Sequence, residues 1–257
     1  MTSAGPSSSN GASPALAALI AGPIAHRGLW SADEAPENSL AAFEAAALAG
    51  YAVELDVQLS ADGEAMVFHD DRLERLTMGY GRLADRRAAE LTALKLGRTD
   101  ERLPSLAEAL NVLAGRVPVL VELKVLGGEE GPLERRVADL LSGYDGPAGL
   151  LSFNPLAVAA FADLAPERPR GLNSLAYTDA AHWLLSIGRR RSLDRLEHAE
   201  TAKADFLSLG LDMLPSPAAD ALRAAGRPVI CWTVRSAHQW ARVKPHCDSF
   251  MFEGWRP

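Results

Sequence analysis

The sequence predicts one α/β domain in which eight parallel strands close into a barrel surrounded by helices. Short apolar segments alternate with Ala- and Leu-rich helical patterns from about residue 23 to the end of the chain, and eight such segments can be identified. Strands that are separated by helices form a parallel sheet. A chain of 257 residues has the length of one (β/α)8 unit, so a closed TIM barrel is the expected topology.

Each predicted strand is a short run of mainly apolar residues. The strands are expected at residues 23–26, 52–57, 117–124, 149–153, 171–175, 205–209, 228–234 and 249–252. Helices are expected between them at residues 39–50, 105–115, 133–143, 155–165 and 217–226. Ser39 and Ser105 begin two of these helices, where a hydroxyl can accept a hydrogen bond from a free backbone N–H group.

One long segment, residues 58–103, interrupts the alternation between the second and third strands. It is longer than an ordinary βα loop and therefore predicts a small capping insertion on the barrel. Its first part alternates in polarity and is expected to form a hairpin with the second strand, turned at residues 61–64. Residues 1–22 are expected to be a partly flexible segment that leads into a single barrel domain at residues 23–257.

The overall charge excludes some partners. The formal net charge is −7, so the surface has no general attraction for nucleic acid, and an anionic substrate needs a local basic site or a cation. The apolar run at residues 15–25 lacks the positive start of a signal peptide and is too short to span a bilayer. We therefore expect a cytoplasmic protein with no integral membrane contact and no nucleic-acid partner.

Chemically informative residues follow the first predicted strand as His26-Arg27-Gly28. His26 can exchange a proton near neutral pH, and the planar guanidinium of Arg27 matches two phosphate oxygens. Gly28 permits a tight turn close to a ligand. A purely structural role for these three residues stays open on this evidence alone.

Two acidic residues on the second strand, Glu54 and Asp56, are two positions apart and therefore point to the same side. Carboxylates placed side by side repel each other unless a positive group joins them, and a hard divalent cation with oxygen ligands is the simplest such group. The alternative is an acidic pair on a solvated strand end. The apolar neighbours Val53 and Leu55 argue against that alternative.

The third strand ends with Glu122 and Lys124, which also share a face. Glu122 could complete a three-carboxylate metal site while Lys124 pairs with a phosphate; a salt bridge between the two is the competing interpretation. His69 follows an apolar strand end and could be a catalytic acid, or a histidine with a structural role. Trp232 near the end of the seventh strand could pack against a short carbon chain or belong to the rim of the core.

These motifs, taken together and in this order, resemble the glycerophosphodiester phosphodiesterase family. The resemblance extends from about residue 23 to residue 255 and includes the stretches HDDRLERLTMGYG and ERLPSLAEAL. The motifs that carry it are His26-Arg27-Gly28, Glu37-Asn38-Ser39, Glu54-x-Asp56, His69-Asp70, Glu122-x-Lys124, Ser152-Phe153 and Trp232-Thr233.

The resemblance implies a TIM barrel with a capping insertion that uses Ca²⁺ or Mg²⁺ to hydrolyse small glycerophosphodiesters to glycerol 3-phosphate and an alcohol. It implies metal ligands (Glu54, Asp56 and Glu122), a general base and a general acid (His26 and His69), phosphate-binding cations (Arg27 and Lys124), apolar walls around the glycerol (Phe153 and Trp232) and a supporting carboxylate (Glu37). A related reading is a lysophospholipase D-type enzyme acting on lysolipids, although no membrane-binding surface helix is evident.

Two positions depart from the family's usual pattern. Arg235 stands where the family commonly has Asn, and Glu253 replaces the Asp of a T-D-x-P element near the C-terminus. Neither position coincides with a proposed metal ligand or histidine. We therefore expect these departures to affect the preference for a head group rather than the type of reaction.

Overall fold

The computed structural model describes residues 13–125, 130–176, 192–193 and 195–257. Eight parallel strands form a closed ring in chain order, because β1 pairs with both β2 and β9. The strands of the ring are β1 (Ile24–His26), β2 (Ala52–Leu59), β4 (Val119–Leu123), β5 (Ala148–Ser152), β6 (Arg170–Ser174), β7 (Phe206–Gly210), β8 (Val229–Val234) and β9 (Ser249–Phe252). The barrel is thus confirmed, and every predicted strand begins and ends within two residues of the observed one.

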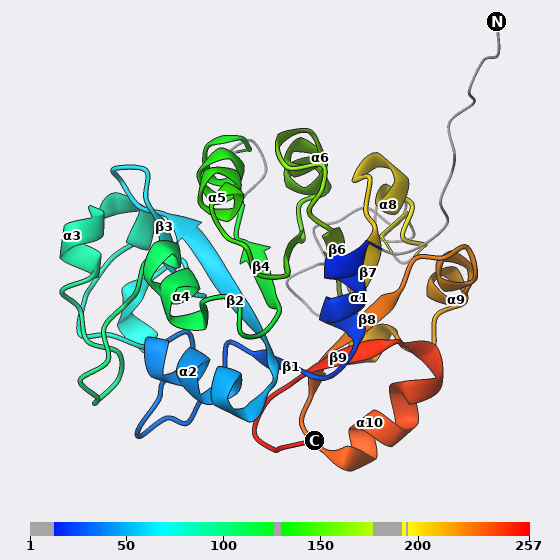
Figure 1. Cartoon of the computed structure of the whole chain (residues 1–257), viewed down its shortest axis with the longest axis horizontal. Helices are drawn as coiled ribbons and strands as arrows, with labels where there is room; N and C mark the ends of the chain where they lie inside the picture. The colour runs from blue at the N-terminus through cyan, green and yellow to red at the C-terminus, as the bar shows by residue number, and fades with distance from the viewer. Residues whose placement is uncertain (1–12, 126–129, 177–191, 194) are drawn as a thin grey trace, which may run out of the picture.

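Helices lie around the outside of the ring (Figure 1). They are α2 (Leu40–Ala49), α4 (Leu106–Leu113), α5 (Pro132–Ser142), α6 (Pro155–Leu164), α8 (His198–Thr201), α9 (Pro217–Ala224) and α10 (Ala237–Val243). The hydroxyl of Ser39 accepts a hydrogen bond from the Ala42 N–H at 3.1 Å, and that of Ser105 accepts one from the Glu108 N–H at 3.3 Å, so both predicted N-caps are confirmed. Among the described residues, no helix has both the length and the apolar character that crossing a membrane would need.

A short helix that the sequence analysis did not anticipate, α1 (Pro14–Ile20), lies over the middle of the ring (Figure 1). The side chains of Leu16 and Leu19 are buried in one cluster with residues of the strands, including Leu120 and Phe206. Because α1 directly precedes β1, it closes the end of the barrel where the strands begin. The opposite end, where the strands finish, is the end at which TIM-barrel enzymes place their active sites.

The predicted insertion lies between β2 and α4, at the side of the barrel (Figure 1). It begins with β3 (Ala65–Val67), which pairs antiparallel with β2 outside the ring; the turn between them is closed by a 2.9 Å hydrogen bond from the Ser60 N–H to the Glu64 carbonyl, as expected. Short helical turns follow as η1 (Leu73–Arg75), η2 (Leu83–Asp85) and α3 (Ala88–Leu91). The insertion has a small apolar core of its own, formed by Met66, Phe68, Leu73, Leu83, Leu91, Leu96 and Leu103.

Candidate active site

A cavity of about 500 Å³ lies at the end of the barrel where the strands finish. Its lining includes eight of the ten predicted site residues: His26, Arg27, Glu37, His69, Glu122, Lys124, Phe153 and Trp232. The other two, Glu54 and Asp56, are buried beside the cavity and contact its lining, since Glu54 accepts a hydrogen bond from Arg27 and Asp56 pairs with Lys124. The fold therefore brings all ten residues into one region.

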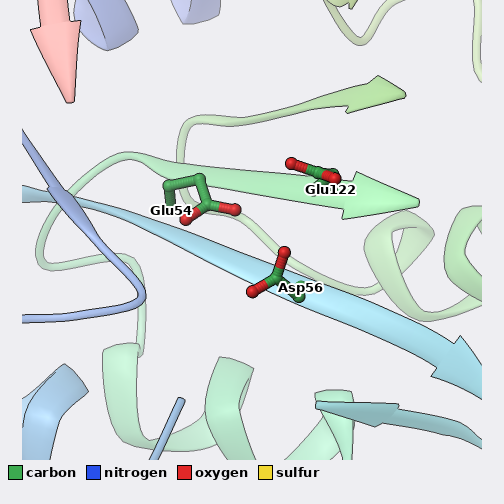
Figure 2. Close-up of side chains that lie close together, drawn as sticks. All are labelled: Glu54, Asp56 and Glu122. Atoms are coloured by element: carbon green, nitrogen blue, oxygen red, sulfur yellow. The ribbon is translucent and has the colours of Figure 1, made fainter. Parts of the chain in front are cut away.

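Three of these residues form a carboxylate triad, consisting of Glu54, Asp56 and Glu122. Figure 2 shows them on the neighbouring strands β2 and β4, whose register places Asp56 directly opposite Glu122. One oxygen from each carboxylate lies within 4.8 Å of the others. Oε1 of Glu54 is buried and has no hydrogen-bond partner among the residues described. Three hard oxygen ligands at this separation suit a divalent cation.

The three carboxylates are buried close together and repel one another. Burial, together with the charges of Asp56 and Glu122, raises the pKa of Glu54 well above its ordinary value. Burial alone would also raise the pKa of Asp56, but Lys124 and Arg27 hold it below its usual range. Lys124 and Arg27 thus do not fully offset the repulsion at Glu54. A cation bound to the three oxygens would offset the rest of it.

Lys124 takes part in both of the arrangements that the sequence left open. Its Nζ lies 2.9 Å from Oδ1 of Asp56 and also contacts Oε1 of Glu122. Burial would lower the pKa of Lys124, but these two carboxylates raise it above its ordinary value, so the ammonium group stays charged. The Glu122–Lys124 salt bridge is thus present within the same cluster as the triad.

Two asparagines that sequence reasoning missed hold the triad in place. Nδ2 of Asn38 donates a hydrogen bond to Oδ2 of Asp56 at 2.9 Å, and Nδ2 of Asn173 donates one to Oε2 of Glu122 at 3.0 Å. Both asparagines are buried. A polar side chain within a buried strand was the available signal for Asn173, which lies near the end of β6.

The turn after β1 directs Arg27 into the site. Arg27 has a φ of 61° and Gly28 a φ of 84°, a left-handed conformation in which glycine is favoured. A Cβ atom on Gly28 would lie 2.8 Å from that of Ala42, so the close approach to α2 also requires glycine. In this conformation the backbone N–H of Arg27 donates to Oε2 of Glu54 at 3.0 Å, and its Nε lies 3.3 Å from Oδ2 of Asp56.

A chain of ion pairs connects Arg27 with His69. Glu37 accepts hydrogen bonds from Arg27 at 2.8 Å and from Arg75 at 2.7 Å. Nε of Arg75 also donates to Oδ2 of Asp70 at 2.5 Å, and Oδ1 of Asp70 lies 2.7 Å from Nδ1 of His69. Sequence reasoning missed the role of Arg75, because η1 belongs to an irregular segment whose path no periodicity predicts.

One ring nitrogen of His69 is engaged by a neighbouring carboxylate. Nδ1 of His69 faces the Asp70 carboxylate, which leaves Nε2 as the nitrogen available to a ligand. Burial lowers the pKa of His69; Lys124 and Arg27 lower it further, while Asp56 opposes them.

His26 also has a carboxylate partner, Glu253, which was expected from the sequence to affect only the preference for a head group. Nδ1 of His26 lies 2.9 Å from Oε2 of Glu253, and Nε of Arg235 donates a hydrogen bond to Oε1 of the same carboxylate at 2.6 Å. The two departures from the family pattern, at positions 235 and 253, thus form one ion pair. The pair contacts a predicted catalytic residue directly.

We expect the stabilising effect of Glu253 to depend on acid pH. The hydrogen bond from His26, together with the nearby Arg235 guanidinium, lowers the pKa of Glu253 from 4.5 to about 2. A carboxyl group whose pKa is lower in the folded protein stabilises it above the unfolded value and loses that effect as pH falls toward the folded value. In urea unfolding, the difference in free energy between the wild type and Glu253→Gln should shrink from pH 5 to pH 3. A difference that stays constant over this range would contradict the assignment.

Aromatic side chains form one wall of the cavity. The rings of Phe153, after β5, and Trp232, on β8, meet edge to face with centroids 5.7 Å apart. A second cavity of about 710 Å³ shares His69, Glu122, Lys124 and Phe153 with the first. Its other lining residues come from the end of β2, the insertion, the ends of β4 and β5 and the start of α5. They include the apolar Leu59, Ala61, Ala84, Leu123, Val125, Pro132 and Leu133 and the polar Gln58, Ser60, Asp71, Arg82 and Ser152.

Solved structures and sequences of several proteins are similar to this chain. A phosphodiesterase of Oleispira antarctica, solved in complex with the product sn-glycerol-3-phosphate, is 29% identical with a TM-score of 0.77, over 90% of this chain and 92% of that one. A glycerophosphodiester phosphodiesterase of Agrobacterium tumefaciens, 24% identical with a TM-score of 0.67 over 90% of this chain and 95% of that one, shares the fold.

Two bacterial sequences are similar over part of their length. YhdW of Bacillus subtilis is 36% identical over 155 residues, which are 57% of this chain and 63% of that protein. A glycerophosphodiester phosphodiesterase of Caldanaerobacter subterraneus is 31% identical over 160 residues, which are 58% of this chain and 65% of that protein. The alignments thus span just under two thirds of these relatives. The sequence model of the glycerophosphoryl diester phosphodiesterase family matches residues 26–246, and the chain therefore belongs to that family.

Proposed function

We propose that this chain is a metal-dependent glycerophosphodiester phosphodiesterase that releases glycerol 3-phosphate and an alcohol, with residues 23–257 acting as one catalytic domain. The observation that carries the proposal is the carboxylate triad, with three oxygens within 4.8 Å of one another in a cavity that also contains His26 and His69. The Oleispira antarctica phosphodiesterase, which was solved with sn-glycerol-3-phosphate, supports the same chemistry.

The charged residues of the cavity suit a phosphodiester. Arg27 and Lys124 line the cavity and would bind the non-bridging phosphate oxygens. The triad would hold a divalent cation such as Ca²⁺ or Mg²⁺, both of which prefer carboxylate oxygens. Such a cation, when bound, polarises a phosphoryl oxygen and stabilises the additional negative charge of the transition state.

The two histidines would transfer the protons. One imidazole removes a proton from the nucleophile as a new P–O bond forms. The nucleophile is water, or it is the 2-hydroxyl of the glycerol, in which case a cyclic phosphate forms and water then hydrolyses it to glycerol 3-phosphate. The other protonates the oxygen of the leaving alcohol as the original P–O bond breaks. Nδ1 of each ring faces a carboxylate, so Nε2 of His26 and of His69 would perform these transfers. Phe153 and Trp232 would pack against the carbon atoms of the glycerol.

A second substrate class is favoured by the larger cavity. That cavity begins at His69, Lys124 and Phe153 and continues along apolar side chains such as Leu59 and Leu133. If the glycerol of the substrate lies against Phe153 and Trp232, an acyl chain esterified to that glycerol can extend into this space. A hydrocarbon chain would be stabilised there by burial of its apolar surface. This observation supports the lysophospholipase D-type alternative, in which the substrate is a lysolipid.

One product assay tests both candidates. Purified full-length chain is treated with EDTA and then supplied with Ca²⁺, Mg²⁺ or Mn²⁺, using glycerophosphocholine, glycerophosphoethanolamine and lysophosphatidylcholine as substrates. We expect glycerol 3-phosphate from the first two substrates, a loss of at least about 100-fold with EDTA, and recovery with one of the cations. Faster turnover of lysophosphatidylcholine would favour the second candidate. Full activity in metal-free enzyme would contradict the proposed role of the triad.

A further inference from the structure

Where the chain closes the ring, His26 contacts Glu253, which in turn contacts Arg235, and the proposed mechanism gives neither Glu253 nor Arg235 a role. Ala25 of β1 pairs with Phe252, the last residue of β9, so the residues that follow them, His26 and Glu253, lie side by side where the ring closes. Oε2 of Glu253 is 2.9 Å from Nδ1 of His26, and both side chains are largely buried, with 11% and 14% of their surface exposed. The contact therefore follows from strand register as well as from side-chain conformation.

The second oxygen of Glu253 is held by a residue that follows the neighbouring strand. Arg235 follows β8, and its guanidinium contacts Oε1 of Glu253 through Nε at 2.6 Å and through a second nitrogen. The backbone of Arg235 is itself anchored, because its N–H donates to Oε1 of Gln239 on α10 at 2.6 Å. With one partner on each oxygen, the carboxylate cannot rotate without losing one of its two contacts.

This arrangement determines which nitrogen of His26 carries a proton. An ionised carboxylate only accepts hydrogen bonds, so Nδ1 of a neutral His26 ring must be the donor. Nε2 is then unprotonated, and it lies 3.9 Å from Oε2 of Glu54, on the side of the triad. The same pattern occurs at His69, whose Nδ1 faces Asp70.

We infer that Glu253, held by Arg235, is a positioning residue that selects the Nδ1-protonated tautomer of the neutral His26 ring and directs Nε2 toward the carboxylate triad. This inference rests on the proposed function, since it assigns His26 a proton transfer. A carboxylate that orients a catalytic histidine and selects its tautomer is a known device for general-base catalysis. Glu253 itself is behind the ring of His26 and does not take part in the proton transfer.

Steady-state kinetics of Glu253→Ala and Glu253→Gln test the inference on glycerophosphocholine. We expect Glu253→Ala to lower kcat by roughly 10- to 100-fold with KM changed less than about threefold, because an orienting partner acts on the reaction rather than on binding. Glu253→Gln should lose less, because its amide oxygen can still accept from Nδ1. Glu44→Gln is the matched control: Glu44 pairs with Arg116 on the surface of α2, away from the cavity.

A double variant tests whether Arg235 acts through Glu253 or binds the substrate directly. If Arg235 acts through Glu253, adding Arg235→Gln to Glu253→Ala should cause no further loss of kcat. A rise in KM that adds to the effect of Glu253→Ala would instead make Arg235 a substrate-binding residue, and would overturn its place in the inference. Circular dichroism of each variant shows whether the fold is kept, and Glu253→Gln serves if Glu253→Ala does not fold.

A spectroscopic measurement tests the tautomer without an activity assay. In ¹⁵N spectra of histidine-labelled protein at pH 8, His26 of the wild type should be protonated at Nδ1, and Glu253→Ala should shift population toward protonation at Nε2. An unchanged tautomer, or a kcat within twofold of the wild type, would overturn the inference. Should the wild type release no glycerol 3-phosphate, the proposed function fails, while the spectra still report whether Glu253 sets the ring.

Discussion

Replacing either proposed catalytic histidine with alanine is expected to lower kcat by about 10²- to 10⁴-fold with the fold intact, because the proposed mechanism assigns one proton transfer to each ring. The expectation applies to His26 and His69 alike, since both line the cavity beside the triad. Release of glycerol 3-phosphate from glycerophosphocholine measures the loss, and circular dichroism checks the fold. Near-wild-type activity in either variant would remove that histidine from the mechanism.

The same two variants can be assigned their separate roles with an activated substrate. A p-nitrophenyl diester of glycerol 3-phosphate has a leaving group that needs no protonation. The variant that lacks the general acid should therefore recover most of its activity on this substrate, whereas the variant that lacks the general base should not. Equal losses on both substrates in both variants would contradict the division into one acid and one base.

Neutralising single members of the carboxylate triad is expected to lower metal-dependent turnover by about 10³-fold, which corresponds to several kcal/mol of lost transition-state stabilisation. The variants are Glu54→Gln, Asp56→Asn and Glu122→Gln. Each should also reduce the rise in Tm that Ca²⁺ or Mg²⁺ causes in the wild type. A variant that keeps both the activity and the metal-induced rise in Tm would show that its residue is not a ligand.

The triad variants should differ in their effect on the metal-free protein. The fold raises the pKa of Glu54, so its ionised form is unfavourable there, and Glu54→Gln should leave stability unchanged or increase it. The fold lowers the pKa of Asp56, whose charge pairs with Lys124 and Arg27. Asp56→Asn removes one carboxylate partner from each of these buried cations, leaving Lys124 with Glu122 and Arg27 with Glu37, and should cost up to about 3 kcal/mol. Urea unfolding in EDTA measures both effects, and equal destabilisation by the two variants would contradict this electrostatic account.

The barrel and the triad could be predicted because both follow from regular backbone geometry. Eight apolar segments separated by helices indicate a closed parallel sheet. Within a strand, residues two apart share a face, so the pattern Glu54-x-Asp56 already placed two carboxylates on the same side. The register of β2 with β4 then adds Glu122, and it does so through ordinary parallel pairing.

Other parts of the site depend on contacts that no local pattern specifies. Arg75 reaches Glu37 and Asp70 from an irregular insertion whose path is set by its own small core. Glu253 reaches His26 only because the ring closes between β9 and β1. The N-terminal apolar run was expected to lead into the barrel, but it also forms α1, because Leu16 and Leu19 can be buried against the inside of the strands.

The central claim is that one cation is bound by Glu54, Asp56 and Glu122 with the substrate phosphate between the two histidines. The most direct test is a crystal structure of the chain grown with Mn²⁺ and glycerol 3-phosphate, with the metal located by anomalous scattering. We predict one strong peak at a coordination distance of about 2.0–2.6 Å from an oxygen of each carboxylate, in contact with a phosphate that lies near Nε2 of both His26 and His69. A metal bound elsewhere, or a phosphate remote from either imidazole, would contradict the account.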